Sequence, residues 1–341
     1  MIKPFLLSTE RLSIQEYKNG ILKSNRFTLA KAITLVESTR AEDQKIANEL
    51  IDQILPYTGN SLRVGITGVP GVGKSTFIET FGTHITNEGK RLAILTVDPS
   101  SQLTKGSILG DKTRMDSLSK NQNAFIRPSA SRDSLGGVAS RTRESMLLCE
   151  AAGYDVIIVE TVGVGQSEVA VKNMVDFFLL LMLAGAGDEL QGIKKGIMEM
   201  ADAVVITKAD GDNVAKATQA RADYQHALNF LRSGSLWKPK VLTCSALEQK
   251  GISDIWKVIG DFENKMKSSG YFDTWRKQQQ LSWFRESFAH ILQMEISKTA
   301  TLSENRAALE TQVVSGSISP MHAAEKLMDA YRQFVRFDSH S

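Results

Sequence analysis

The chain has 341 residues and a formal net charge of +3, with 42% hydrophobic and 23% charged residues. These values are typical of a globular protein with a large core, and so small a net charge gives no electrostatic footprint for nucleic acid. The longest apolar run, residues 177–184, is far shorter than the roughly 20 residues that a membrane-spanning helix needs.

We expect no targeting signal in the first residues. Residues 1–5 lack a secretory hydrophobic segment with a cleavage site, and they lack the Arg- and Ser-rich bias of a transit peptide. The two cysteines, Cys149 and Cys244, stand alone in apolar segments, which is typical of buried thiols in a reducing compartment. We therefore expect a cytoplasmic protein that makes no membrane contact.

Residues 1–60 predict an N-terminal helical extension. Ile46, Leu50 and Ile54 recur every four residues and form one apolar stripe. Pro56 and Gly59 then end the helical pattern.

Residues 61–262 alternate short apolar strands with helical segments. This alternation predicts an α/β domain with a mostly parallel sheet that helices flank on both faces. In such sheets, ligands bind at the carboxyl ends of the strands. The expected strands are 62–67, 91–97, 124–127, 155–160, 176–183, 203–207 and 240–244.

A phosphate-binding loop follows the first expected strand and precedes a helical segment. Residues 68–75 match G-x-x-x-x-G-K-[ST] at every fixed position, which predicts a P-loop NTPase fold. Backbone N–H groups of such a loop cradle phosphate oxygens, Lys74 reaches the β- and γ-phosphates, and the Ser75 hydroxyl coordinates Mg²⁺. The expected nucleotide contacts are Gly68, Val69, Pro70, Gly71, Val72, Gly73, Lys74, Ser75 and Thr76.

Two acidic residues at strand ends complete an expected metal site. Asp98 follows the strand 91–97, and Glu160 ends the strand 155–160. Mg²⁺ binds through one or two carboxylates together with phosphate oxygens and waters, so both acids are placed to hold it directly or through water. Gly163 would let its N–H approach the γ-phosphate.

Residues 207–210 indicate which base is bound. Thr207, Lys208 and Asp210 resemble the guanine-reading N/T-K-x-D motif, in which the Asp carboxylate accepts two hydrogen bonds that adenine cannot offer. Such bonds to a charged group are worth about 1.5–3 kcal/mol each, so the site rejects adenine. Thr replaces the commoner Asn, which we expect to weaken the tie to the phosphate loop by about 1 kcal/mol. A weaker match to the last guanine loop is Ser245, Ala246 and Leu247.

Residues 263–341 predict a second helical region. Leu281, Phe284, Phe288 and Ile291 follow helical spacing, and Ser319-Pro320 indicates the start of a further helix. The apolar and aromatic residues of this region either pack against the main domain or form a dimer interface, and the sequence leaves both interpretations open.

The chain resembles a known family, the MeaB/ArgK family of P-loop GTPases, whose human member is the methylmalonic aciduria type A protein. The resemblance covers nearly the whole chain. The segments that carry it are 68–76, 98–101, 106–115, 127–129, 135–139, 160–168 and 185–196.

The resemblance implies a homodimeric GTPase that binds GTP, GDP and Mg²⁺. It implies a chaperone of adenosylcobalamin-dependent acyl-CoA mutases, chiefly methylmalonyl-CoA mutase, that gates cofactor loading and protects the mutase. The domains would be the extension 1–60, the GTPase domain 61–262 and the dimerisation region 263–341.

Specific roles are also carried over by the resemblance. Asp98, Asp111 and Glu160 would serve magnesium and switch function. The switch segments would be 106–116, 160–172 and 185–196. The chain departs from the family pattern at Asp133, where relatives usually carry Gly, and at Thr207.

Slow intrinsic hydrolysis is expected. In Ras-type GTPases a Gln directly after the switch glycine orients the attacking water. Here that position is Val164, whose side chain cannot orient water, and Gln166 lies two residues on. The expected catalytic groups are therefore Lys74, with Asp111 and Gln166 arriving when a partner reshapes the switches.

Three alternative functions differ in the residues that they require. A metal-delivering GTPase for a nickel enzyme needs His/Cys clusters, whereas the five histidines are scattered and no C-x-x-C occurs. A protein kinase for arginine/ornithine transport, an older label of the family, would need the H-R-D and D-F-G motifs, and the sequence does not contain this set. A scaffold that binds GTP without turnover stays open.

Overall fold

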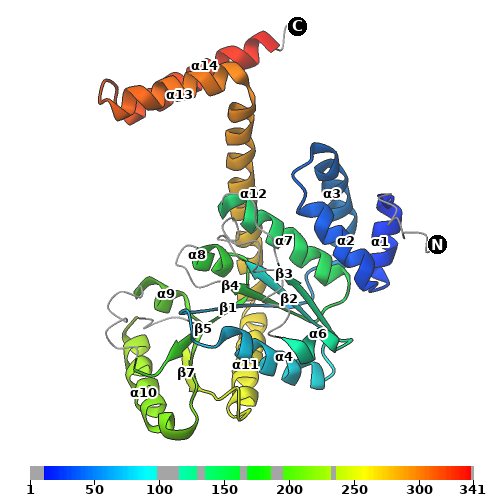
Figure 1. Ribbon diagram of the computed structural model, residues 1–341, viewed down its shortest axis with the longest axis vertical. Coiled ribbons are helices and arrows are strands. Elements are labelled where there is room, and N and C mark those ends of the chain that lie inside the picture. The colour runs from blue at the N-terminus through cyan, green and yellow to red at the C-terminus, as the bar shows by residue number, and fades with distance from the viewer. Residues whose placement is uncertain are drawn as a thin grey trace, which may run out of the picture. The chain divides into compact units, whose positions relative to one another are not determined.

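The computed structural model describes residues 11–97, 115–128, 135–161, 167–185, 195–231 and 236–338. Seven strands form one sheet in the order β3-β2-β4-β1-β5-β6-β7, and every neighbouring pair is parallel (Figure 1). This confirms the predicted α/β fold. The strands are β1 Leu62–Gly68, β2 Leu92–Val97, β3 Ala124–Pro128, β4 Val156–Thr161, β5 Phe177–Leu183, β6 Ala203–Thr207 and β7 Lys240–Thr243.

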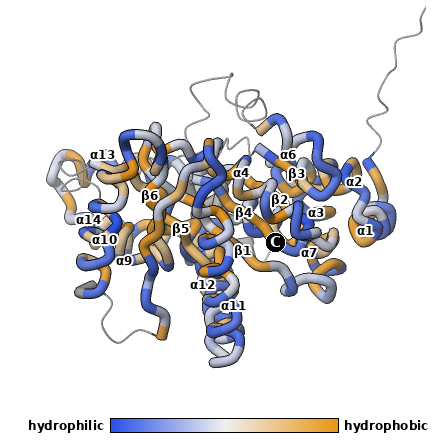
Figure 2. Tube along the Cα trace, turned by 90° about the horizontal axis from the view of Figure 1, so that it is seen from below, coloured by the Kyte–Doolittle hydropathy of each residue, from blue (hydrophilic) through white to orange (hydrophobic). Residues whose placement is uncertain are grey.

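The central strands are apolar because helices cover both faces of the sheet. β1 pairs with β4 on one side and with β5 on the other, and β5 is buried along nearly its whole length. Continuous apolar runs of this kind are typical of buried parallel strands. Figure 2 shows apolar residues gathered along β5 and β6.

Helices lie on both sides of the sheet (Figure 1). α4 and α11 contact each other on one side, while α7 and α8 cover the other. The helices of the α/β region are α4 Lys74–Asn87, α6 Asp116–Lys120, α7 Leu135–Ala151, α8 Ser167–Lys172, α9 Lys195–Met200, α10 Val214–Leu231 and α11 Ile252–Ser268, with a 3-10 turn η3 Gly211–Asn213.

Gly65 allows α8 to approach β1 closely. A Cβ atom at this position would lie 2.9 Å from Val171 Cγ1 and 2.9 Å from Phe178 Cδ2. Any larger residue would therefore push away α8, which carries residues of the candidate site.

Three helices and a short 3-10 turn form the N-terminal segment, as the sequence predicts. They are α1 Ile14–Leu22, α2 Arg26–Val36, α3 Ala41–Ile54 and η1 Leu55–Tyr57. Ser13 and Glu16 form a capping box at α1, and Asn25 caps α2. All three helices pack against α7.

A buried ion pair between Arg276 and Asp176 connects the start of α12 (Tyr271–Lys298) to the amino-terminal edge of the sheet. Arg276 Nε and Nη2 donate to the two carboxylate oxygens of Asp176, at 2.9 and 2.7 Å. The same guanidinium donates to the carbonyls of Gly59 and Ser61. One side chain thus joins α12, β5 and the chain that enters β1.

The chain divides into two compact units, residues 1–279 and 280–341, and the boundary falls within α12. The second unit contains the helices α13 Ala300–Val314 and α14 Pro320–Asp338, which pack against each other. α14 begins at Pro320, and the His322 N–H is 3.3 Å from the Ser319 hydroxyl that caps it. This confirms the predicted helix start.

No helix in the described part of the chain is long and apolar enough to cross a membrane. Both cysteines, Cys149 and Cys244, are buried and free.

Candidate nucleotide-binding site

The phosphate loop connects the end of β1 to the start of α4. Gly71 and Gly73 adopt left-handed φ values of 78° and 90°, and the Val72 N–H donates to the Val69 carbonyl at 3.2 Å. A Cβ at Gly68 would lie 2.6 Å from the Leu181 carbonyl oxygen. The glycines of the motif are therefore required by backbone geometry, and the resulting curl is the form that holds phosphate.

Lys74 is the first residue of α4, and its side chain folds back over the loop. Its Nζ donates to the Gly68 carbonyl at 2.8 Å and lies 3.4 Å from the Val69 carbonyl. Burial lowers the pKa of Lys74, while the nearby carboxylates of Glu160 and Glu168 act to raise it. Ser75 is half-buried and Thr76 is exposed in the same first turn. A phosphate bound here would meet an ammonium group that lacks full solvation.

The loop that follows β6 is joined directly to the phosphate loop. The Thr207 hydroxyl donates to the Val72 carbonyl at 2.8 Å, and Lys208 Nζ donates to the Gly71 carbonyl at 2.9 Å. Lys208 has a φ of 56°, an uncommon conformation for a residue other than glycine. The Thr that replaces the commoner Asn thus makes its own tie to the phosphate loop.

Asp210 lies against the loop that follows β7. The Ser245 hydroxyl donates to Asp210 Oδ2 at 2.6 Å, and the Ala209 N–H donates to the Cys244 carbonyl at 3.0 Å. The Ala246 carbonyl accepts from the Thr80 hydroxyl of α4 at 3.2 Å. Leu247 is exposed beside them. The structure therefore gathers the three segments that the sequence analysis assigned to one nucleotide.

Of the expected metal ligands, Ser75 and Glu160 lie among the described residues, and Glu160 is the only carboxylate of the two. It is buried near the end of β4, pairs in register with Thr96 and Ile66, and acts electrostatically on Lys74. Asp98, Asp111, Gly163 and Gln166 lie outside the described residues.

The donor set present fits magnesium. Within the described ranges, no group of three or more His, Cys, Asp or Glu residues is placed to hold a metal. Mg²⁺ in nucleotide sites needs only one or two carboxylates, because phosphate oxygens and waters complete the octahedron. A Ser75 hydroxyl and a Glu160 carboxylate beside the phosphate loop meet that requirement.

Glu168 is a residue of this site that the sequence analysis did not select. It lies in the first turn of α8, is buried, and acts electrostatically on Lys74 as Glu160 does. The family resemblance placed residue 168 within the expected switch 160–172 but gave it no role of its own, because the packing of α8 on β1, which brings Glu168 toward the phosphate loop, is a tertiary feature.

Residues 29–301 match the family model described as "Methylmalonyl Co-A mutase-associated GTPase MeaB". The chain is 54% identical over 275 residues to GTPase ArgK of Escherichia coli (strain K12), which covers 80% of this chain and 82% of that protein. It is 44% identical over 341 residues to the mitochondrial methylmalonic aciduria type A homolog of Mus musculus, which covers 95% of this chain and 82% of that protein.

A solved structure described as a LAO/AO transport system kinase has a similar fold. Its TM-score is 0.76 at 41% sequence identity, and the match covers 95% of this chain and 99% of that chain. The likeness therefore includes both helical ends as well as the sheet.

Proposed function

Because the chain belongs to the MeaB family of methylmalonyl-CoA mutase-associated GTPases, we propose that it binds and hydrolyses GTP as the chaperone of an adenosylcobalamin-dependent acyl-CoA mutase. The observation that carries the GTPase assignment is the joining of three loops. Thr207 and Lys208 bond to the phosphate loop, and Ser245 bonds to Asp210.

Guanine recognition rests on Asp210. Its Oδ2 accepts from the Ser245 hydroxyl, which orients the carboxylate at the end of β6. A guanine N1–H and 2-amino group would donate to this carboxylate, whereas adenine would leave it unpaired. Backbone N–H groups of residues 245–247 would contact the base oxygen.

Phosphoryl transfer from GTP needs positioning and charge neutralisation more than covalent chemistry. Lys74 and the loop amides supply positive charge where the phosphates bind. Ser75 and Glu160 would hold Mg²⁺, with Asp98 and Asp111 added by the family resemblance, and the ion would neutralise charge on the β- and γ-phosphate oxygens.

Hydrolysis is slow in the isolated protein and faster with the partner. Val164 offers no polar group where Ras-type enzymes place the water-orienting Gln, so Gln166 and Asp111 complete the site only when the switches are reshaped. Single-turnover hydrolysis by Gln166→Ala, measured with the mutase present, tests this. An unchanged rate would remove Gln166 from the mechanism.

The mutase partner is supported by the names of the family and its relatives. Methylmalonyl-CoA mutase is the first candidate, and the proposed role is to gate cofactor loading and protect the enzyme.

We propose a cytoplasmic location, since both thiols of the protein are buried and free.

The decisive experiment mixes the full-length protein with purified acyl-CoA mutases and measures both complex formation and GTP hydrolysis. We expect a complex with one mutase and a rise in the hydrolysis rate. The matched control is Asp210→Asn protein, which should not respond to GTP. If no mutase binds or stimulates the wild-type protein, the chaperone function is wrong, although GTP binding would stand.

We also propose that residues 263–341 form a homodimer interface. Phe284 and Phe288 on α12 are 68% and 61% exposed, and Leu281 and Ile291 on the same helix are exposed as well. Apolar residues at this helical spacing form one stripe, which a second copy of the chain would cover.

A further inference from the structure

A cavity of about 400 Å³ lies at the edge of the sheet opposite the phosphate loop. Asp176 and Asp202, which directly precede β5 and β6, mark this edge, whereas Gly68 and Thr207 end their strands at the nucleotide edge. We call it the aromatic cavity. Its lining residues are Lys172, Asp176, Asp202, Leu236, Trp237, Phe262, Met266, Tyr271, Phe272 and Trp275.

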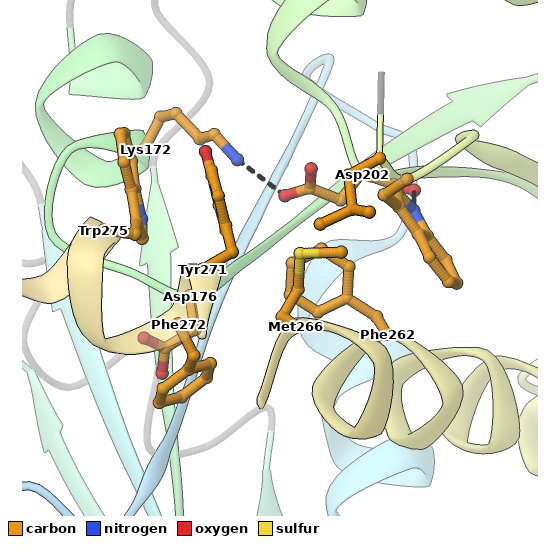
Figure 3. Close-up of a pocket in the computed structure, with 10 residues that line it drawn as sticks. Lys172, Asp176, Asp202, Phe262, Met266, Tyr271, Phe272 and Trp275 are labelled. Carbon is orange, nitrogen blue, oxygen red and sulfur yellow. Dashed lines mark hydrogen bonds and ion pairs between the residues drawn. The ribbon is translucent and has the colours of Figure 1, made fainter. Parts of the chain in front are cut away.

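Five of the ten lining residues carry aromatic rings. Trp237 and Phe262 meet edge to face with centroids 5.2 Å apart, and Tyr271 and Trp275 lie nearly parallel at 6.4 Å. Figure 3 shows the rings from the start of α12 on one side and Phe262 and Met266 from α11 on the other. Flat ring faces with an apolar body suit a planar aromatic ligand, and the volume is in the range of small-molecule sites.

The charged groups at the cavity cancel one another. Lys172 Nζ and Asp202 Oδ2 form an ion pair at 2.6 Å (Figure 3), and Asp176 is held by Arg276. A charged ligand would therefore lose its hydration without gaining a counter-ion, and a neutral ligand is favoured.

Hydrogen-bond donors are available at the rim. The Lys172 ammonium has three N–H groups and gives one to Asp202, and Tyr271, which is about half exposed, carries a hydroxyl. A carbonyl or ring acceptor on the ligand would pair with either group.

α8 links the cavity to the nucleotide site. Val171 of this helix packs on Gly65 of β1, the strand that leads into the phosphate loop, and the next residue, Lys172, pairs with Asp202 at the cavity. Glu168 in the first turn of the same helix acts electrostatically on Lys74. A movement of Lys172 on ligand binding would thus shift α8 against β1 and the phosphate loop.

We propose that the aromatic cavity binds a neutral, planar aromatic molecule with a hydrogen-bond acceptor, and that α8 transmits its binding to the nucleotide site. The second half of this statement depends on the proposed nucleotide function, whereas the first half does not.

The binding test uses coumarin, a neutral planar lactone, titrated by calorimetry into the full-length protein without nucleotide. We expect saturation at one site per chain and binding at least tenfold weaker for coumarin-3-carboxylate, its anionic analogue. Tyr271→Ala and Leu236→Ala, both at exposed rim positions, should weaken coumarin binding at least fivefold.

The matched control is Phe27→Ala, which removes an exposed ring of α2 outside the cavity and should leave coumarin binding unchanged. Thermal unfolding of each variant verifies its fold. Absence of saturable binding, equal binding of the anion, or equal weakening by Phe27→Ala would overturn the site.

The coupling test measures release of a fluorescent GDP analogue with and without saturating coumarin. We expect the release rate to change at least threefold in the wild-type protein and to stay constant in Asp202→Asn, which removes the charge that holds Lys172. A coumarin-insensitive rate in the wild type, or a full response in Asp202→Asn, would overturn the α8 route. Failure to bind the GDP analogue at all would count against the proposed function instead, since the coumarin titration contains no nucleotide.

Discussion

The Thr207 hydroxyl donates to the Val72 carbonyl at 2.8 Å, so one hydrogen bond joins the proposed base-binding loop to the phosphate loop across 135 residues of sequence. Both residues are buried, and the hydroxyl has a single hydrogen to give. Its 3.2 Å approach to the Met182 carbonyl is therefore the weaker of its two contacts. Together with the bond from Lys208 to Gly71, this bond sets the relative position of the two loops proposed to bind the base and the phosphates.

Thr207→Val should loosen the nucleotide without unfolding the protein. The substitution keeps the side-chain shape but leaves the buried Val72 carbonyl unsatisfied, which costs about 1–3 kcal/mol. We expect GDP to dissociate roughly five- to a hundredfold faster in stopped-flow measurements. Thr218→Val, which removes an exposed hydroxyl bonded within α10, is the control and should release GDP at the wild-type rate.

Asp210→Asn should change which base is bound. The amide offers an N–H₂ donor in place of a carboxylate oxygen, so it suits xanthine, which presents an oxygen where guanine has its amino group. Competition between GTP and xanthosine triphosphate should shift toward the latter by at least tenfold. Asp212→Asn alters an exposed acid two residues away and should preserve GTP preference. Retained GTP selectivity in Asp210→Asn would refute the guanine assignment.

The buried positive charge of Lys74 should lower the free energy of unfolding when no nucleotide is bound. Burial lowers the pKa of Lys74 below its ordinary value of 10.5. Between the lowered pKa and 10.5 the unfolded chain binds more protons at this residue, so its contribution to stability rises with pH across that window.

Lys74→Met removes this effect, and the comparison is made by urea unfolding between pH 7 and pH 10. We expect the nucleotide-free variant to gain stability relative to the wild type at pH 7 and to lose that advantage as the pH rises, while GDP binding is lost at every pH. Lys216→Met, at an exposed position of α10, controls for loss of a lysine. A difference that grows with pH would contradict the sign.

Arg276 should be among the largest single contributors to the stability of residues 11–279. The side chains of Arg276 and Asp176 are only 12% and 1% exposed, and Arg276→Met would leave a buried carboxylate without its cation. That change costs about 3–5 kcal/mol. In urea unfolding, Asp176→Asn should restore part of the loss in the double variant. Arg306→Met, from an exposed pair with Glu310, should cost less than about 1 kcal/mol.

The seven strands were predictable because each is a short apolar run bounded by polar residues, and each lies within one residue of its expected bounds at both ends. The phosphate loop was predictable for a similar reason, since its motif is contiguous and its glycines satisfy a backbone requirement at Gly71 and Gly73. Both the strands and the phosphate loop can therefore be predicted from contiguous residues alone.

Features that depend on distant segments were not predictable. Glu168 acts electrostatically on Lys74 because α8 packs on β1 beside Gly65, and the family segment 160–168 does not single out this residue. The pairing of Arg276 with Asp176 spans 100 residues, and the aromatic cavity collects side chains from several elements. Such groupings follow from topology rather than from any periodicity.

Dimer formation through α12 makes a further prediction. Phe284 and Phe288 stack with centroids 6.5 Å apart, and both rings are largely exposed. Burying two such rings against a second chain would contribute about 3 kcal/mol or more.

The double variant Phe284→Ser/Phe288→Ser should therefore weaken self-association at least a hundredfold, as measured by sedimentation over a range of protein concentrations. Phe27→Ser, which removes a comparably exposed ring from α2, is the matched control and should sediment as the wild type does. Because the nucleotide site lies within residues 11–279, GDP affinity per chain should be unchanged in the double variant. A wild-type protein that stays monomeric at every concentration, or a double variant that dimerises as tightly as the wild type, would exclude α12 as the interface.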